Sequence, residues 1–339
     1  MGKASSRENN SVVNSMGDNW RMGMTATLVY AVVAIYLYQP YFNRFGLLRF
    51  FIPLNLCIAA LGAYALSRRW VFSFWASLFA GLIYGFGPTM LQLNGYHPTA
   101  GFMAAMIPWL FYPAAYGPKD KLHWVSRCLS LLPFLAIVTF FTVTTHLHLF
   151  AIPKQIKLHA IDLLRFFTPT VKINGGPAYF GFYHVPIVPL LMGFAMLIAA
   201  QRRGIIIIVL AGLVLAFSKS FLNVTPIMWA TIPALCSAIL IGGGTQALAG
   251  AGFSDRKWIL MAAIVSAVLS VLTMLLALKY SPAFLQAAKM YMLGAVVAGT
   301  IFFMLLAKLR IRWVKMLILC LAMALDIFFG ARYIVDMQF

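Results

Sequence analysis

The chain has 339 residues, of which 63% are hydrophobic and only 10% charged, and its mean hydropathy is +0.89. This composition excludes a soluble domain of that length and indicates several membrane spans. The formal net charge of +19 comes from basic residues that stand in ones and twos between apolar runs, which disfavours nucleic-acid binding because that function needs a continuous basic surface.

The first 22 residues are polar, and we expect them to form a short disordered tail in the cytoplasm. They lack the apolar core of a cleaved signal peptide, so the first span is expected to act as an uncleaved signal anchor. Residues 23–339 are then predicted to form a single transmembrane domain.

Eleven apolar runs are long enough to cross roughly 30 Å of hydrocarbon as helices. We place them near residues 23–41, 47–67, 70–91, 98–116, 129–150, 182–200, 204–221, 226–250, 258–278, 287–306 and 313–331. Only helices satisfy their own backbone hydrogen bonds within lipid. The sequence therefore predicts an all-α, polytopic bundle of about eleven transmembrane helices.

Small residues at four-residue spacing predict where these helices pack closely. One strip consists of Gly243, Ala247 and Ala251. Two more lie in the tenth span and consist of Gly294 with Ala298 and Ala295 with Gly299.

The orientation follows from counting Lys and Arg on alternate sides of the eleven spans. Sixteen lie on the side of the N-terminus and ten on the other side. Cytoplasmic loops carry the excess of positive charge. We therefore expect a multi-pass protein of the bacterial inner membrane, with its N-terminus in the cytoplasm and its C-terminus outside.

The longest connection, at about 151–181, contains a predicted amphipathic helix at about 152–168. Its apolar residues recur at helical spacing, and its cations lie toward the other side. Such a helix could lie in the outer interface and offer its cations to lipid phosphates. It could equally be a helix that only caps the bundle.

Most of the histidines fall at or near the outer face in this topology. Together with the cations of the long connection they form a candidate site for the phosphate of a lipid, which Arg would bind in bidentate fashion. Its predicted residues are His97, Lys154, Lys157, His159, Arg165 and His184. The alternative is that polar residues simply collect wherever helices leave the bilayer.

Metal ligands do not form a recognisable pattern. His146 and His148 are two residues apart, so on one helix they point to nearly opposite sides. The four cysteines are isolated from one another and suit neither a zinc site nor a disulfide framework. We therefore predict no metal and no other cofactor from the residues themselves.

One carboxylate, Asp326, falls clearly within a predicted span. Ionisable residues within the membrane are candidates for function. We expect Asp326 near the outer end of the last span, at the depth of Arg49 in the second, so that the two residues could form an ion pair. The alternatives are that Asp326 simply snorkels to the interface, or that it couples protons.

Four segments follow one another in a recognisable order near the start of the chain. A helix ending in AYALSRRW precedes a helix running to GLIYGFGPTM, and the turn NGYHPTA then leads to a helix containing AAMIPWLFYP. With FFTPTVKINGGPAYFGFYHVP and TPIMWATIPALCSAILIGGGTQALAGAG farther on, this order resembles the bacterial YfhO-like proteins. These belong to the GT-C class of polytopic glycosyltransferases, which use lipid-linked sugar donors. The resemblance covers roughly 47–255 and matches His97 to the histidine of the outer turn, Pro108 to the helix kink and Gly181 to the glycine of YFG.

This resemblance implies a GT-C-like scaffold with acidic catalytic or metal-binding residues in a large loop after the first span. In the present sequence that connection is only about residues 38–46 and contains no Asp or Glu. No side chain at that place could act as a general base or hold a divalent metal. We therefore expect a non-catalytic scaffold that acts as a structural or accessory subunit of a membrane complex, or that binds lipid-linked or anionic lipid groups at the outer face.

Two other functions stay open. An active glycosyltransferase would use a polyprenyl-phosphate sugar, with Asp162 as its base and, as the resemblance implies, a divalent metal. A transporter would use Asp326 as its coupling group. The expected partners are membrane lipids and other membrane-protein subunits.

Overall fold

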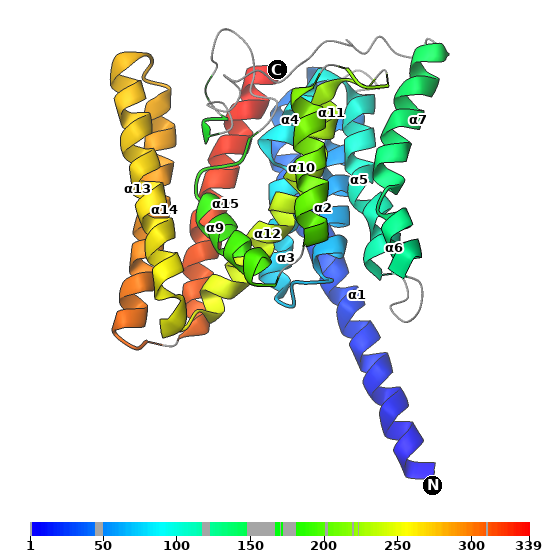
Figure 1. The fold of residues 1–339 in the computed structure, drawn as a ribbon, viewed down its shortest axis with the longest axis horizontal. Helices are drawn as coiled ribbons and strands as arrows, with labels where there is room; N and C mark the ends of the chain where they lie inside the picture. Colours follow the sequence, from blue (N-terminus) through cyan, green and yellow to red (C-terminus); the bar gives the residue numbers. More distant parts are fainter. Residues whose placement is uncertain are drawn as a thin grey trace.

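The computed structural model describes residues 2–44, 50–116, 123–147, 167–169, 171, 181–200, 203–218, 220–222, 224–309 and 311–339. Regular structure in these residues is helical, apart from one isolated bridge between Phe221 and Val224. The predicted all-α fold is confirmed. Figure 1 shows a bundle of roughly parallel and antiparallel helices. The N-terminus and the C-terminus of the chain lie at opposite ends of this bundle.

The helices follow one another along the chain in two halves. The first half contains α1 (Gly2–Tyr38), the 3-10 helix η1 (Gln39–Arg44), α2 (Phe51–Ser67), α3 (Phe74–Gly85), α4 (Pro88–Tyr96), α5 (Pro98–Tyr116), α6 (His123–Leu129) and α7 (Leu132–His146). The second half contains α9 (Ile187–Ala199), α10 (Arg203–Phe217), α11 (Pro226–Trp229), α12 (Thr231–Gly250), η3 (Phe253–Asp255), α13 (Arg256–Lys279), α14 (Phe284–Leu306) and α15 (Arg312–Gln338).

In the described part of the chain, seven helical stretches are long and apolar enough to cross a membrane, which indicates a multi-pass membrane protein by length and composition. They are Trp20–Asn43, Phe74–Tyr96, Arg127–His146, Pro226–Gly250, Phe253–Lys279, Phe284–Leu306 and Arg312–Gln338. Three shorter apolar helices are Phe51–Ser67, Ile187–Ala199 and Gly204–Phe217.

The first helix begins much earlier than the first predicted span. Helix α1 starts at Gly2, and the cytoplasmic tail over the first 22 residues stays a prediction. The earliest proline of the chain is Pro40. Nothing before it removes a backbone donor, and the helix continues until that proline approaches.

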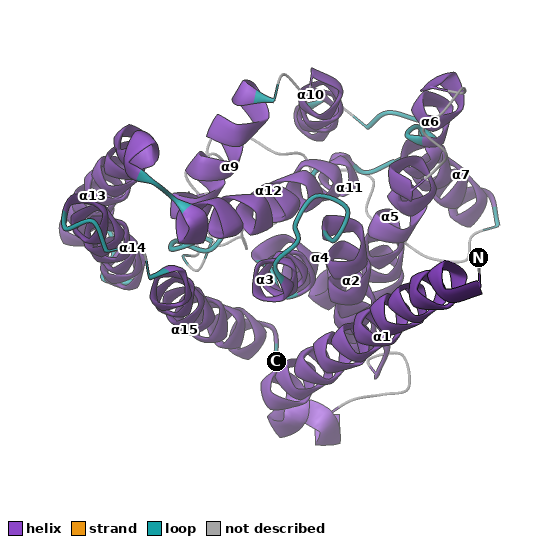
Figure 2. Ribbon diagram, turned by 90° about the horizontal axis from the view of Figure 1, so that it is seen from below, coloured by secondary structure: helices purple, strands orange, loops and turns teal. Residues whose placement is uncertain are grey.

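Helix α12 lies at the centre of the bundle, between α9 and α3 as Figure 2 shows. Glycines bring these helices together. A Cβ added to Gly244 would overlap the carbonyl oxygen of Pro189, and one added to Gly193 would overlap that of Leu240. The backbones of α9 and α12 are therefore in direct contact, as small residues permit.

The predicted small-residue strips are confirmed only in part. A Cβ on Gly243 would meet nothing within 4 Å, so the strip starting at that residue does not form the tight contact. The contact uses Gly244, one residue farther along and about 100° around the helix. In α14, Gly294 and Ala298 are buried as predicted, whereas Ala295 and Gly299 are half-exposed.

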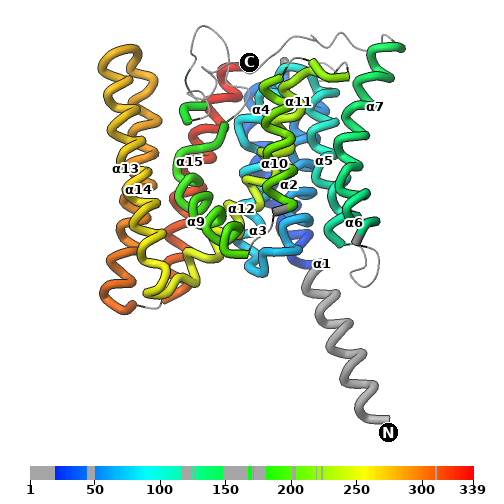
Figure 3. Tube along the Cα trace, in the orientation of Figure 1, coloured from blue at the N-terminus to red at the C-terminus, as the bar shows by residue number. Residues whose placement is uncertain are grey.

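Two further features position the interior polar groups. Helices α13 and α14 form an antiparallel hairpin at one edge of the bundle (Figure 3), packed on α9 and α15. The span formed by α3 and α4 is interrupted at Phe86 and Gly87, immediately before Pro88. This proline has no N–H to continue the hydrogen bonds of α3, so the carbonyl groups of the break need other partners.

Candidate functional site

The most unusual polar group in the interior is a buried pair of ionisable side chains. Asp326 and His184 are each only 1% exposed. The imidazole Nδ1 of His184 lies 3.0 Å from Oδ1 of Asp326. The other carboxylate oxygen accepts a hydrogen bond of 2.6 Å from the backbone N–H of Val185. Both oxygens of the carboxylate are thus bonded within the chain.

The pair joins two distant parts of the sequence. Asp326 belongs to α15, and His184 lies in the non-helical residues 181–186 that lead into α9. Asp326 is fourteen residues from the first residue of α15 and twelve from the last, or about 20 Å from either end. The carboxylate therefore lies midway along α15, and its depth near the outer end of the span stays a prediction.

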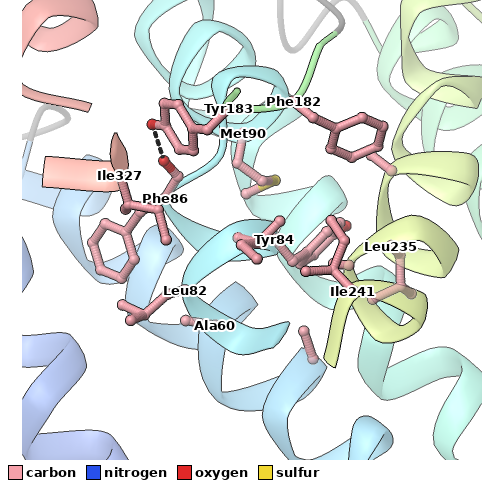
Figure 4. Close-up of a cluster of buried hydrophobic side chains, with 14 of the residues drawn as sticks. Ala60, Leu82, Tyr84, Phe86, Met90, Phe182, Tyr183, Leu235, Ile241 and Ile327 are labelled. Atoms are coloured by element: carbon pink, nitrogen blue, oxygen red, sulfur yellow. Dashed lines mark hydrogen bonds between the residues drawn. The ribbon is translucent and has the colours of Figure 1, made fainter. Parts of the chain in front are cut away.

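Aromatic side chains enclose the pair. The ring of Tyr291, on α14, lies perpendicular to the imidazole with centroids 5.0 Å apart, and its hydroxyl donates to the carbonyl of Phe167 at 2.7 Å. The hydroxyl of Tyr183 donates to the carbonyl of Phe86 at 2.6 Å, as Figure 4 shows. The break between α3 and α4 therefore finds its partner in the residue just before His184.

A glycine makes room for this arrangement. A Cβ on Gly330 would overlap the ring of Tyr183, so only glycine allows the tyrosine to lie against α15. Asp326 and Gly330 are one helical turn apart on the same face of α15. One face of α15 thus contacts two consecutive residues of the segment before α9. Gly330 lies against Tyr183, and Asp326 bonds to His184.

The hydrogen bonds favour one proton arrangement. An ionised carboxylate can only accept, which assigns the proton of a neutral imidazole to Nδ1 of His184. Nε2 is buried and has no hydrogen-bond partner among the residues that the structure describes. A neutral imidazole leaves the carboxylate charge balanced only by dipoles. A charged imidazolium balances that charge but adds an Nε2–H for which the described residues offer no acceptor.

A second buried polar cluster connects α2, α4 and the start of α5. The side-chain nitrogen of Asn55 donates to Oδ1 of Asn94 at 3.0 Å and to the carbonyl of Pro98 at 2.8 Å. The side-chain nitrogen of Asn94 donates to the carbonyl of Ile52 at 2.7 Å. These amides hold three helices in register, since unpaired polar groups would be costly in the interior.

The predicted phosphate site is described only in part. His97 follows α4 and is half-buried, and its Nδ1 lies 2.5 Å from the hydroxyl of Thr99. Burial lowers the pKa of His97 from its ordinary value. The ring is therefore neutral at pH 7 and would offer a phosphate a hydrogen bond rather than a charge.

The second described member of that site, His184, lies in the interior against Asp326 rather than at the surface. The other predicted residues (Lys154, Lys157, His159, Arg165 and the alternative base Asp162) lie outside the described residues, as does nearly all of the predicted helix at 152–168. Arg49 lies outside them too, so its pairing with Asp326 stays a prediction. Within the described ranges, no group of three or more His, Cys, Asp or Glu side chains could hold a metal ion.

Sequence reasoning singled out both Asp326 and His184 but did not pair them. A carboxylate within a span needs donors, and a histidine beside an apolar helix is one candidate. The two residues are 142 positions apart in the sequence, and nothing in the sequence favours this histidine over the others.

A surface feature stands out at the opposite end from the C-terminus. Six tryptophans are exposed, namely Trp20, Trp70, Trp75, Trp124, Trp258 and Trp313. The segments that carry them lie at the lower end of the bundle in Figure 1. The same segments carry Arg21, Arg68, Arg69, Arg256, Lys257 and Arg312. We call this the basic end. Tryptophan at this density is typical of a membrane–water interface.

No family model, curated protein or solved structure matches the chain.

Proposed function

We propose that the chain crosses the bacterial inner membrane eleven times, with a GT-C-like arrangement. The seven long apolar helices would be joined by the three shorter ones and by α5, which coincides with the predicted span at 98–116. The cations and tryptophans of the basic end support a cytoplasmic location for that end. The C-terminus, at the other end of the bundle (Figure 1), would then lie outside.

We infer that the protein serves as a non-catalytic structural or accessory subunit of a membrane complex, and that it binds lipid-linked or anionic lipid groups at its outer face. One observation carries the structural part: buried polar side chains on α2, α4, α12 and α15 bond to one another or to the backbone of a neighbouring segment. Lys315, for example, donates to the carbonyl of Ala251 at 3.0 Å. Such bonds hold a bundle together without presenting a reactive group.

Native purification tests this role. We expect the protein, extracted in lipid nanodiscs at its native expression level, to copurify with other membrane-protein chains in fixed ratio and with anionic or polyprenyl lipids above their bulk fraction. Quantitative mass spectrometry of proteins and lipids gives the readout. A multi-pass protein of similar abundance from the same membranes is the control. A lone chain with lipids in bulk proportion would contradict both parts of the proposal.

We infer proton-coupled transport as a second candidate, because the Asp326–His184 pair lies midway along α15 and Nε2 of His184 has no partner among the described residues. If the pair exchanges protons, infrared titration of the protein in liposomes should show a carboxylic-acid band that appears as the pH falls. Asp326→Asn should abolish this band, and Asp336→Asn should leave it. A spectrum without a titrating band assignable to Asp326 would leave only the structural role.

The active glycosyltransferase is the third candidate and depends on Asp162. Asp162→Asn should then abolish sugar transfer while leaving binding of the polyprenyl-phosphate donor unchanged. Transfer that survives this substitution would remove Asp162 as the base.

A further inference from the structure

The basic end contains a groove that none of these functions uses. It has a volume of about 580 Å³ and lies between the turn joining α2 to α3 and the start of α15. Its lining residues are Phe72, Ser73, Ile311, Arg312, Trp313 and Met316. The groove is shallow and open, so it suits a ligand that lies along the surface rather than one that is enclosed.

One wall of the groove is held in place by hydrogen bonds. The side-chain oxygen of Gln246, on α12, accepts from the backbone N–H groups of Phe72 and Ser73 at 2.7 and 2.8 Å. The guanidinium of Arg68 donates to the carbonyl of Phe72 at 2.6 Å. The turn is thus fixed before any ligand arrives, which lowers the entropic cost of binding.

The groove is positively charged. The guanidinium of Arg312 is exposed and makes no hydrogen bond or ion pair with any residue that the structure describes. Arg68 borders the groove through its bond to Phe72, and the hydroxyl of Ser73 does not cap α3. An arginine with free donors beside a hydroxyl suits a phosphate group, which it can bind in bidentate fashion.

The aromatic residues of the groove identify the source of that phosphate. Phe72 is 81% exposed and Trp313 is 69% exposed, and both lie at the level of the other exposed tryptophans. Apolar side chains so exposed in a membrane protein face lipid. A soluble phosphate would leave them uncovered, whereas a phospholipid would place its glycerol backbone and acyl chains against them.

We propose that this groove binds the headgroup of an anionic phospholipid, with Arg312 on the phosphate and Trp313 on the glycerol region. Ser73 donates its hydroxyl to a phosphate oxygen, and the acyl chains lie along Phe72. The site lies at the end opposite to the lipid groups proposed for the outer face. It does not depend on the accessory role, since it requires no partner chain.

Native mass spectrometry of the purified full chain, titrated with phosphatidylglycerol, tests the site. We expect one lipid to bind more tightly than the rest, and Arg312→Gln to weaken that binding about tenfold. Lys257→Gln is the matched control, because Lys257 is exposed at the same end, lies outside the groove and carries the same charge. It should change the affinity less than twofold. Trp313→Ala should weaken binding as well, and Trp258→Ala should not.

Each alternative has its own result. Equal losses in the Arg312 and Lys257 variants would mean that the lipid responds only to net charge, and would overturn the site. Equal affinity for phosphatidylcholine would overturn the requirement for an anionic lipid. Displacement of the lipid by millimolar inorganic phosphate or glycerol phosphate would make the groove a site for a soluble anion. Arg312 and Trp313 are both exposed, so their variants should fold, which the elution volume in size-exclusion chromatography checks.

Discussion

Replacement of Asp326 by alanine is expected to lower the free energy of unfolding by about 3–5 kcal/mol. The substitution removes the acceptor of two buried donors, the backbone N–H of Val185 and Nδ1 of His184. Both would stay buried without a partner. Asp326→Asn should cost less, because its side-chain oxygen can still accept from Val185. Denaturation in mixed micelles of mild detergent and dodecyl sulfate gives the free energy.

The C-terminal part of the same helix offers a matched control. Asp336 pairs with Arg332 at 2.9 Å, but both side chains are partly exposed. Asp336→Ala should therefore lower the free energy of unfolding by less than about 1 kcal/mol. If Asp326→Ala and Asp336→Ala lower the free energy of unfolding by the same amount, the buried pair does not stabilise the fold in the way its geometry indicates.

The second large effect is expected where α9 and α12 touch. Gly244→Ala should lower the free energy of unfolding by about 3 kcal/mol or more, since the new methyl group would overlap the carbonyl of Pro189 and crowd the backbone nitrogen of Gly193. Backbone atoms cannot move aside as a flexible side chain can. The two helices would have to separate. The same denaturation measurement applies, and a lowered thermal midpoint should accompany the loss.

The adjacent residue supplies the control. Gly243→Ala introduces the same methyl group where nothing lies within 4 Å. It should leave stability unchanged or raise it by up to about 1 kcal/mol, because alanine favours a helix more than glycine does. Equal losses at the two positions would mean that contact with α9 is not what lowers the stability of the Gly244 variant.

Composition and apolar run length are sufficient to predict the helical fold and its membrane setting. They do not determine which face of α12 meets its neighbours. Gly242, Gly243 and Gly244 are consecutive, and the helix is apolar nearly all round, so no polar face sets its rotation. The sequence therefore gives no reason to prefer Gly244, which forms the contact with α9, over Gly243, where the predicted four-residue spacing begins.

The last helix also extends beyond its predicted end at residue 331. The predicted last span ends at residue 331, where the apolar run meets Arg332. In the structure, Arg332 and Asp336 pair one turn apart and the helix continues to Gln338. Charges that satisfy each other do not end a helix. The partner of Asp326 could not be predicted at all, since pairing it with His184 requires the arrangement of α9, α14 and α15.

The hydrogen bonds of Asp326 also bear on the order in which the chain is completed during synthesis. His184 and Val185 leave the ribosome more than a hundred residues before the carboxylate that they bind. Until the last helix inserts, the segment before α9 has no acceptor for these donors, and the ring of Tyr183 lacks the surface beside Gly330 on which it lies. In chains that end before α15, the segment before α9 should therefore stay unpacked. We expect membrane proteases to degrade such chains faster than the full chain. Insertion of the final helix would then complete the packing of the segment before α9.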